Sequence, residues 1–480
     1  MNKNHNFMPQ TVTVRDFTVD AQGIAATDSG TVFIPGCVPG DTVKVISVKK
    51  HKNYISAENF DIVSPSPDRI KPDCPVFGEC GGCSFRSITY ASELNFKQQT
   101  VENALRRIGK ITAEIRPIVG AENPLRYRNK AQLPVSRDKK GTFAGFYSRG
   151  SHSAVRCTSD CLLQPEIFSH IAKLMCMFMD EKNIPCYNEK TSSGLVRHIF
   201  LRCTSDGRIM VCIVINGDKM PFEEELVKLL TCKFPSIESI ILNINKKNTN
   251  VILGDKMRNI YGRGFIEDTL CSLKFRISPN SFYQVNHDQA ERLYKKAAEY
   301  ANPEGKNLID MYCGVGTVGL SMADKAKSII GVEIVEKAVK DAAENAKLNG
   351  INNARFICGD ASLAAEKLSG EGIKADVVIL DPPRKGCDGA LISVLCQKIK
   401  PERIVYISCN PATLARDCAE FEKNGYTFKE RPRLICSPVP AMWRRSLCSS
   451  RKKRRATTLP KNGKNKKCSE KPLPTGASQF

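Results

Sequence analysis

A cysteine beside an expected strand end is the residue whose setting says most about chemistry. Ser408-Cys409-Asn410-Pro411 follows the apolar run 403–407, and a helix-forming segment starts at Ala412. Sites in open α/β sheets lie at the carboxyl ends of strands, and a helix N-terminus favours the thiolate of a nearby thiol. A lone cysteine is usually a buried structural residue, but this setting favours Cys409 as a nucleophile among 21 cysteines.

Two further motifs predict a nucleotide-derived cofactor near this thiol. The apolar run 308–312 ends in a Gly314-Val315-Gly316 turn, where the backbone approaches a ligand closely, and we expect a helix from Val318 to Ala326 to follow. Glu333 lies 19 residues beyond Gly314, where a carboxylate suits ribose hydroxyls. A dinucleotide and S-adenosylmethionine both fit this pattern, as does a turn with no ligand. The absent third glycine disfavours a dinucleotide, and Asp381-Pro382-Pro383 after the fourth strand favours the methyl donor.

A thiol and a methyl donor together are what methylation of carbon 5 of a pyrimidine requires. Carbon 5 of uracil is a poor nucleophile until a thiolate adds at carbon 6 and turns the ring into an enolate. The enolate attacks a methyl sulfonium, and a general base must then remove the proton at carbon 5 so that the thiolate leaves.

Three cysteines have the spacing of metal ligands. Cys74, Cys80 and Cys83 are separated by five and two residues, and Cys157 and Cys161 are candidates for a fourth ligand. Zinc and iron–sulfur clusters both accept four thiolates, so the spacing does not choose between them. Unligated thiols in a loop are the remaining alternative.

The elements around these motifs predict an α/β multidomain chain. Residues 10–64 contain short strand-like runs separated by Gly and Pro, as in an OB-like β-barrel of five strands that binds single-stranded nucleic acid. Their lysines are equally compatible with a merely solvated surface. Residues 65–285 predict a central α+β domain with the cysteine motif, including a helix over 93–109. From residue 286 to 450, strands and helices alternate as in a Rossmann-like domain.

Composition points to a nucleic-acid partner in the cytoplasm. A length of 480 residues predicts two or three domains, and a net charge of +22 favours a polyanion. Residues 451–480 hold ten Lys or Arg against one Glu and predict a basic disordered tail. The sequence has no signal peptide and no apolar run of about 18 residues, so we expect no membrane contact. In a reducing cytoplasm the cysteines are thiols or ligands rather than disulfides.

Residues 10–433 resemble the TRAM-domain RNA 5-methyluridine methyltransferases, in particular the RumA/RlmD class of 23S rRNA (uracil-5-)-methyltransferases. The resemblance implies a TRAM barrel over residues 10–64, 23S rRNA as partner, a covalent Cys–uracil adduct and a monomeric enzyme. Bacterial tRNA methyltransferases of this kind lack the barrel and the cysteine motif, which disfavours a tRNA substrate. The motifs that carry the resemblance are Cys80-Gly81-Gly82-Cys83, Arg126-Tyr127-Arg128-Asn129-Lys130, Ser281-Phe282-Tyr283-Gln284-Val285-Asn286, Asp381-Pro382-Pro383-Arg384-Lys385-Gly386 and Ser408-Cys409-Asn410-Pro411.

The resemblance also assigns roles to individual residues. It implies that Cys409 attacks the uracil and that four residues contact S-adenosylmethionine, with Asp360 a further candidate beside the adenine. It implies a [4Fe–4S] cluster with a structural or RNA-contacting role, because the reaction needs no electron. The four cofactor residues are Gln284, Tyr312, Glu333 and Asp381, and the cluster ligands are Cys74, Cys80, Cys83 and Cys161.

The C-terminal part departs from the family pattern. Related enzymes end with a His-Val-Glu-like motif, whose Glu is the base at carbon 5, in a segment that supplies the last strand of the sheet. Here no Glu follows Glu430 until Glu470. The segment Met442-Trp443-Arg444-Arg445 instead puts two cations where a central strand should be apolar.

A shift of reading frame accounts for this departure. Ala-Met-Trp-Arg-Arg-Ser, residues 441–446, can be encoded GCC ATG TGG AGA CGG TCG, and the overlapping frame reads His-Val-Glu-Thr-Val. We therefore predict a single-base insertion or deletion near codons 428–434 that replaced the family ending, including the basic tail. Two functions remain open: an RNA methyltransferase, or a catalytically impaired RNA-binding remnant without the base.

Overall fold

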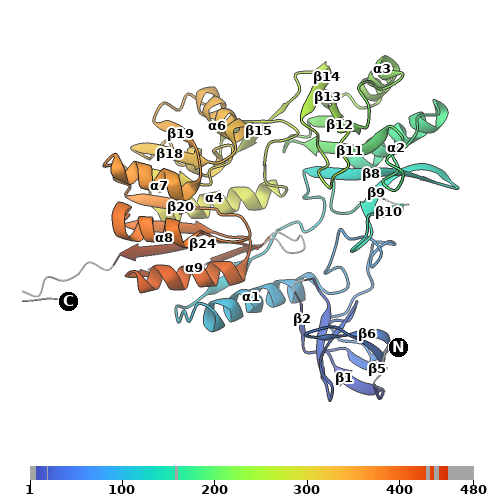
Figure 1. Cartoon of the computed structure of the whole chain (residues 1–480), viewed down its shortest axis with the longest axis horizontal. Helices are drawn as coiled ribbons and strands as arrows, with labels where there is room; N and C mark the ends of the chain where they lie inside the picture. Colours follow the sequence, from blue (N-terminus) through green and yellow to red (C-terminus); the bar gives the residue numbers. More distant parts are fainter. Residues whose placement is uncertain (1–6, 19, 157–159, 429–432, 437–442, 452–480) are drawn as a thin grey trace, which may run out of the picture.

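A computed structural model describes residues 7–18, 20–156, 160–428, 433–436 and 443–451, and its described elements form three large sheets and a two-stranded hairpin with their covering helices (Figure 1). Apart from Arg451, the predicted basic tail lies outside the described residues. Among the described helices, none is both long enough and apolar enough to cross a membrane.

The N-terminal module is a six-stranded sheet in the order β1-β5-β6-β4-β3-β2, one strand more than the five predicted. Alternating apolar residues of β4 and β5 fill its core, where Val32, Ile34, Val43 and Val45 are fully buried. The strands are β1 (Gln10–Thr13), β2 (Asp16–Phe17), β3 (Gly23–Thr27), β4 (Gly30–Ile34), β5 (Thr42–Lys50) and β6 (Ile55–Ser64).

Helix α1 (Tyr90–Arg107) joins the barrel to the C-terminal module and lies alongside α9 (Pro411–Lys423) (Figure 1). It begins three residues before the predicted start, because the Thr89 side chain accepts a hydrogen bond from the Ser92 N–H over 3.2 Å and caps the helix. Val101 and Leu105 of α1 are buried in a core that also contains residues of the barrel and of the C-terminal sheet.

The central module is a seven-stranded sheet in the order β10-β9-β8-β11-β12-β13-β14. Helices α2 (Glu166–Glu181) and α3 (Glu223–Lys233) cover one face, and residues of the hairpin β15–β16 share a buried cluster with the other. Helix α4 (His287–Ala301) packs on the C-terminal sheet. Strands covered on both faces read as continuous apolar runs, which explains the wholly buried β12. The strands are β8 (Lys130–Asp138), β9 (Gly141–Tyr147), β10 (Ala154–Arg156), β11 (Val196–Cys203), β12 (Ile209–Ile215), β13 (Ile237–Ile244), β14 (Lys256–Gly262), β15 (Ile266–Leu270) and β16 (Leu273–Ile277).

The C-terminal module is the predicted Rossmann-like sheet, in the order β19-β18-β17-β20-β21-β24-β23-β7. Strands β17 to β21 are parallel, and the strand order reverses between β17 and β20, which is where ligands bind in such sheets. The strands are β7 (Arg116–Val119), β17 (Asn307–Met311), β18 (Ser328–Glu333), β19 (Ala354–Cys358), β20 (Val377–Leu380), β21 (Arg403–Ile407), β22 (Tyr426–Phe428), β23 (Arg433–Cys436) and β24 (Trp443–Arg451). The other helices are α5 (Thr317–Leu320), α6 (Glu336–Leu348), α7 (Ala361–Gly370) and α8 (Gly389–Val394), with a π-turn at Leu395–Ile399.

The helix after the glycine turn is shorter than the sequence predicts. We expected it to run from Val318 to Ala326, whereas α5 ends at Leu320. The Ser321 hydroxyl donates to the Val318 carbonyl over 2.7 Å, and such local bonds compete with continuation of a helix.

Strand β24 lies inside the sheet, between β21 and β23. It pairs with β21 in antiparallel register, with Ile407 opposite Ser446 and Tyr406 opposite Leu447. The segment that departs from the family pattern therefore forms the strand that comes last in the chain. This strand pairs with β21, which leads to Cys409.

Candidate active site

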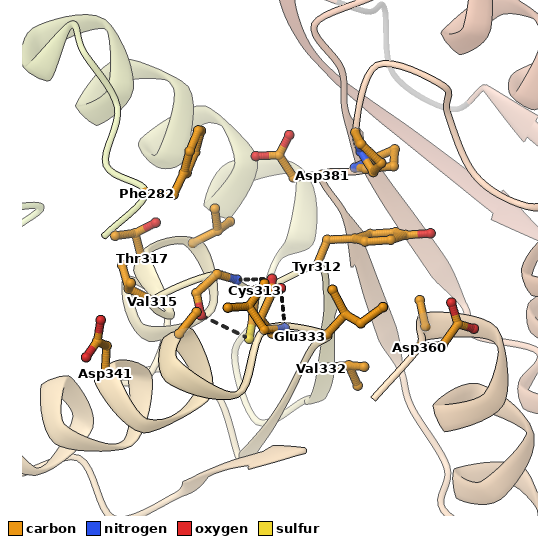
Figure 2. Close-up of a pocket in the computed structure, with 18 of the residues that line it drawn as sticks. Phe282, Tyr312, Cys313, Val315, Thr317, Val332, Glu333, Asp341, Asp360 and Asp381 are labelled. Atoms are coloured by element: carbon orange, nitrogen blue, oxygen red, sulfur yellow. Dashed lines mark hydrogen bonds between the residues drawn. The ribbon is translucent and has the colours of Figure 1, made fainter. Parts of the chain in front are cut away.

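A cavity of about 860 Å³ lies at the carboxyl ends of β17, β18, β20 and β21 (Figure 2). This volume suits a cofactor-sized ligand. The structure places all five predicted site residues on its wall: Gln284, Tyr312, Glu333, Asp381 and Cys409. Asp360, the further candidate, also lines it (Figure 2).

The glycine turn after β17 is fixed by the carboxylate at the end of β18. The Gly314 N–H donates to Glu333 Oε2 over 3.1 Å, and the Val335 N–H donates to Glu333 Oε1 over 3.0 Å. Gly314 has φ +56°, and a Cβ added there would meet no atom within 4 Å. The turn therefore presents open backbone to the cavity, as a loop that cradles a ligand does.

Beneath this turn lies a buried carboxyl group. Asp310 Oδ2 accepts a hydrogen bond from the Gly319 N–H over 2.9 Å, which ties the end of β17 to α5. Burial raises the pKa of Asp310 to about 8, with smaller contributions from the charges of Asp381 and Glu333 and against the lowering effect of the Gly319 hydrogen bond. The Asp310 carboxyl is therefore largely neutral at pH 7. The next residue but one, Tyr312, has φ +67°, a conformation that residues other than glycine adopt at tight functional turns.

The opposite wall comes from the loop between β16 and α4. Its Gln284 is 7% exposed, and the Asn129 side chain donates to the Gln284 carbonyl over 2.8 Å. The Asn129 N–H also donates to the Val285 carbonyl over 2.9 Å. The central module, through a residue just before β8, thus holds the loop that carries Gln284.

Phe282 is a cavity residue to which the sequence assigned no role. It lies on the same loop as Gln284, its side chain is 61% exposed, and Figure 2 shows it at the cavity. An exposed aromatic ring at a binding cavity offers a stacking surface to a planar base. The signals available in the sequence were its place in the Ser281–Asn286 motif and its aromatic side chain two positions before Gln284.

Cys409 lies where the sequence predicts, between the end of β21 and the start of α9. Asn410 caps α9 by accepting a hydrogen bond from the Ala412 N–H over 3.0 Å. The Asn410 side chain also donates to the Arg384 carbonyl over 3.1 Å. The nucleophile candidate therefore lies next to a helix N-terminus and beside the Asp-Pro-Pro-Arg loop, and its side chain is partly exposed.

The four predicted cluster cysteines do not line this cavity. Burial raises the pKa of Cys83 to about 12, with smaller contributions from Cys161, Cys80 and Cys74. Among the described residues, however, no three His, Cys, Asp or Glu side chains are arranged to hold a metal ion. Cys157, the other candidate ligand, lies outside the described residues.

Comparisons with known proteins agree with this architecture. Residues 89–429 match the family model described as tRNA (uracil-5-)-methyltransferase, and residues 11–67 match the TRAM domain of tRNA (uracil(54)-C(5))-methyltransferase. A protein of Halalkalibacterium halodurans called an uncharacterized RNA methyltransferase is 42% identical over 87% of this chain and 92% of its own length. One of Caldanaerobacter subterraneus with the same description is 43% identical over 85% and 90%.

A solved structure covers nearly the whole chain. It is the tRNA (uracil-54, C5)-methyltransferase of Pyrococcus abyssi in complex with S-adenosyl-L-homocysteine, with a TM-score of 0.74, 26% identity, and coverage of 92% of this chain and 100% of that one. Because TRAM domains also occur in this tRNA enzyme class, the barrel does not separate an rRNA from a tRNA substrate. The match over 89–429 and the identity to relatives over most of their length place this chain in the tRNA (uracil-5-)-methyltransferase family of RNA methyltransferases, with an N-terminal TRAM domain.

Proposed function

We propose that this protein methylates carbon 5 of a uridine in 23S rRNA, with S-adenosylmethionine as methyl donor and Cys409 as nucleophile. The observation that carries the proposal is the single cavity with Cys409 and four cofactor-site candidates on its wall. We assign RNA binding to the barrel of residues 10–64, support of the site to residues 65–285, and the chemistry to residues 286–450, in a cytoplasm that keeps the thiols reduced.

The cavity wall fits the methyl donor. The open backbone of Gly314 leaves room for the ligand, and the Glu333 carboxylate offers acceptors to ribose hydroxyls. The Gln284 amide suits the amino-acid end. When bound, S-adenosylmethionine supplies a methyl group on a positively charged sulfur, and carboxylates such as Asp381 favour that charge.

The chain's own steps begin at Cys409. Its thiolate forms a bond to carbon 6 of the uracil, and the electron pair of the C5–C6 double bond moves into the enolate. The α9 N-terminus favours the thiolate, and Asn410 fixes its backbone against the Asp-Pro-Pro-Arg loop. After methylation a base takes the proton at carbon 5, the double bond reforms, and the carbon–sulfur bond breaks so that Cys409 leaves with its electrons.

Transfer of radiolabelled methyl to RNA tests the substrate. We expect transcripts of 23S rRNA segments to acquire label at a uridine, and tRNA transcripts to acquire none. Label on tRNA alone would replace the rRNA proposal with the tRNA function for which the family and the Pyrococcus abyssi relative are named.

Glu333→Gln is expected to weaken S-adenosylmethionine binding roughly tenfold or more, since a hydrogen bond to a charged group is replaced by one to a neutral amide. Calorimetric titration measures the dissociation constant. Glu336→Gln is the matched control, because Glu336 is an exposed residue of α6 that pairs with Lys340 and does not line the cavity. Equal binding by Glu333→Gln and the unsubstituted protein would remove Glu333 from the cofactor site.

We also propose that Cys74, Cys80, Cys83 and Cys161 hold a [4Fe–4S] cluster. Four thiolates are the donor set that such a cluster takes, and Cys74, Cys80 and Cys83 have the spacing of ligands, although the described side chains are not arranged around a metal ion as they stand. The cluster, when present, would crosslink the loop before α1 to the loop after β10. The methyl transfer itself uses no electron, so we assign the cluster no step.

Cys83→Ser is expected to lose bound iron and sulfide, because an alkoxide is a far poorer ligand for iron than a thiolate. Iron and sulfide are measured after anaerobic reconstitution, with Cys232→Ser, a substitution of an exposed cysteine, as the control. Zinc in place of iron, or no metal in the unsubstituted protein, would contradict the cluster.

A second candidate function is a catalytically impaired RNA-binding protein. Residues 431–469 contain no acidic residue, and the family match ends at residue 429, beside the codons where we predict the frame change. In the antiparallel pairing of β21 with β24, Ile407 lies opposite Ser446. The same register, continued two residues beyond the end of β21, places Cys409 opposite position 444. The overlapping frame encodes Glu across codons 443 and 444, so the base would be missing at the level of the nucleophile.

A further inference from the structure

Asp417 of α9 is a buried carboxylate on which hydrogen-bond donors from three segments converge. Its side chain is 1% exposed. The Tyr406 hydroxyl donates to Asp417 Oδ2 over 2.6 Å, and the Cys387 N–H donates to the same oxygen over 2.8 Å. Arg416 Nε donates to Asp417 Oδ1 over 2.8 Å. The carboxylate therefore joins β21, the loop 381–387 and α9.

The loop 381–387 is in direct contact with this carboxylate. Gly386 has φ +82°, and a Cβ added there would lie 2.5 Å from both Asp417 Oδ2 and the Arg416 guanidinium, so only glycine allows the approach. The Arg416 guanidinium also donates to the Lys385 carbonyl over 3.0 Å. Residues from Asp381 to Gly386 line the cavity, so the contact fixes part of the cavity wall.

The same loop is tied to the segment that carries Cys409. The Arg384 carbonyl accepts hydrogen bonds from the Asn410 amide over 3.1 Å and from the Thr413 hydroxyl over 3.3 Å. Asp417 thus holds the C-terminal end of the loop through the Cys387 N–H. Asn410 and Thr413, which follow the nucleophile, hold its middle through the Arg384 carbonyl. A shift of the loop would therefore change the position of the cavity wall relative to Cys409.

The network also extends to the cofactor side of the cavity. Besides burial, the Cys387 thiol raises the pKa of both the Tyr406 and the Tyr312 hydroxyl, and Tyr312 lines the cavity. Burial raises the pKa of Cys387 to about 12 and also raises that of Tyr406, so both groups keep their protons at neutral pH. The Tyr406 hydroxyl therefore remains a donor to Asp417 at neutral pH.

We propose that Asp417 is a positioning residue that fixes the loop 381–387, and with it the donor side of the cavity, relative to the sulfur of Cys409. The inference rests on the proposed function and adds a residue that touches neither RNA nor cofactor. Asparagine is a poor substitute for Asp417, because both carboxylate oxygens accept hydrogen bonds. In either orientation of the amide, its NH₂ group would point at a donor.

The rate at which a 5-fluorouridine-containing 23S rRNA fragment becomes covalently attached tests this inference in the full-length protein. With S-adenosylmethionine present, we expect Asp417→Asn to slow attachment roughly 10- to 100-fold, as a misplacement of about 1 Å does. The dissociation constant for S-adenosylmethionine should rise by a smaller factor than the attachment rate falls, because Asp381 is the only one of the four proposed cofactor residues on the displaced loop. Tyr406→Phe removes the hydroxyl that donates to Asp417 and adds no repulsive donor. It should also slow attachment, but by a smaller factor than Asp417→Asn.

Asp376→Asn controls for loss of stability alone. Asp376 Oδ2 accepts from the Asn307 N–H over 2.8 Å at the opposite end of the same sheet, so this variant should lower the melting temperature without slowing attachment. If Asp417→Asn does not fold, Tyr406→Phe decides. Attachment at the unsubstituted rate in the folded variants overturns the inference. So does an Asp376→Asn variant that slows attachment as much as Asp417→Asn does for the same loss of melting temperature. Failure of the unsubstituted protein to attach overturns the proposed function instead.

Discussion

Cys409→Ala is expected to abolish both methyl transfer to RNA and covalent attachment to 5-fluorouridine-containing RNA. Alanine has no lone pair to add at carbon 6, so the ring stays aromatic and carbon 5 stays unreactive. Loss of a nucleophile of this kind lowers the rate on the order of 10⁴-fold or more. Single-turnover transfer of a labelled methyl group measures the first effect, and a denaturing gel shows the second.

The variant should keep its cofactor site and its fold. Cys409 follows β21 and precedes the cap of α9, and the capping hydrogen bond comes from Asn410 rather than from the thiol. Binding of S-adenosylmethionine is therefore expected to be unchanged. Cys358→Ala, which removes an exposed thiol at the end of β19, is the matched control and should retain attachment. Normal methylation by Cys409→Ala would overturn the mechanism.

The sequence predicted the sheet, and the placement of site residues on it, because both depend on local patterns. Apolar runs marked β17, β18, β20 and β21, and residues just after such runs must meet at one edge of a parallel sheet. Glu333 and Asp381 could therefore be placed together before any coordinates were known, and the structure puts both on the cavity wall.

Features that depend on contacts between distant segments were not predictable. Nothing local indicates that Asn129 binds the backbone of Gln284, 155 residues away, or that Asp417 reaches Cys387. The early start of α1 is a different case, since Thr89 is a common capping residue whose signal was available in the sequence. The cysteine motif lies between these cases: the spacing brings the thiols near one another but does not fix a metal site.

Repair of the reading frame should convert the protein from one that attaches to RNA once into one that turns over. The chain with residues 431–480 as they stand has no acidic residue before Glu470, so we expect methylated RNA to remain bound to Cys409 in a complex that survives denaturant. In the repaired chain, in which the overlapping frame is read from codons 428–434 onward, a carboxylate returns level with Cys409. A general base contributes about 10²–10⁴-fold, and here it acts on the step that releases product.

The number of methyl groups transferred per enzyme molecule distinguishes the two chains. The unrepaired chain should stop after about one transfer per molecule, and the repaired chain should continue. The matched control is the repaired chain with glutamine encoded in place of that carboxylate, which keeps the strand and its pairing with β21 but cannot take the proton. It should attach to RNA and stall like the unrepaired chain, which separates loss of the base from loss of the strand. Sustained turnover by the unrepaired chain would show that another cavity carboxylate, such as Asp381, serves as the base, and an unshifted gene across codons 425–450 would refute the frame change itself.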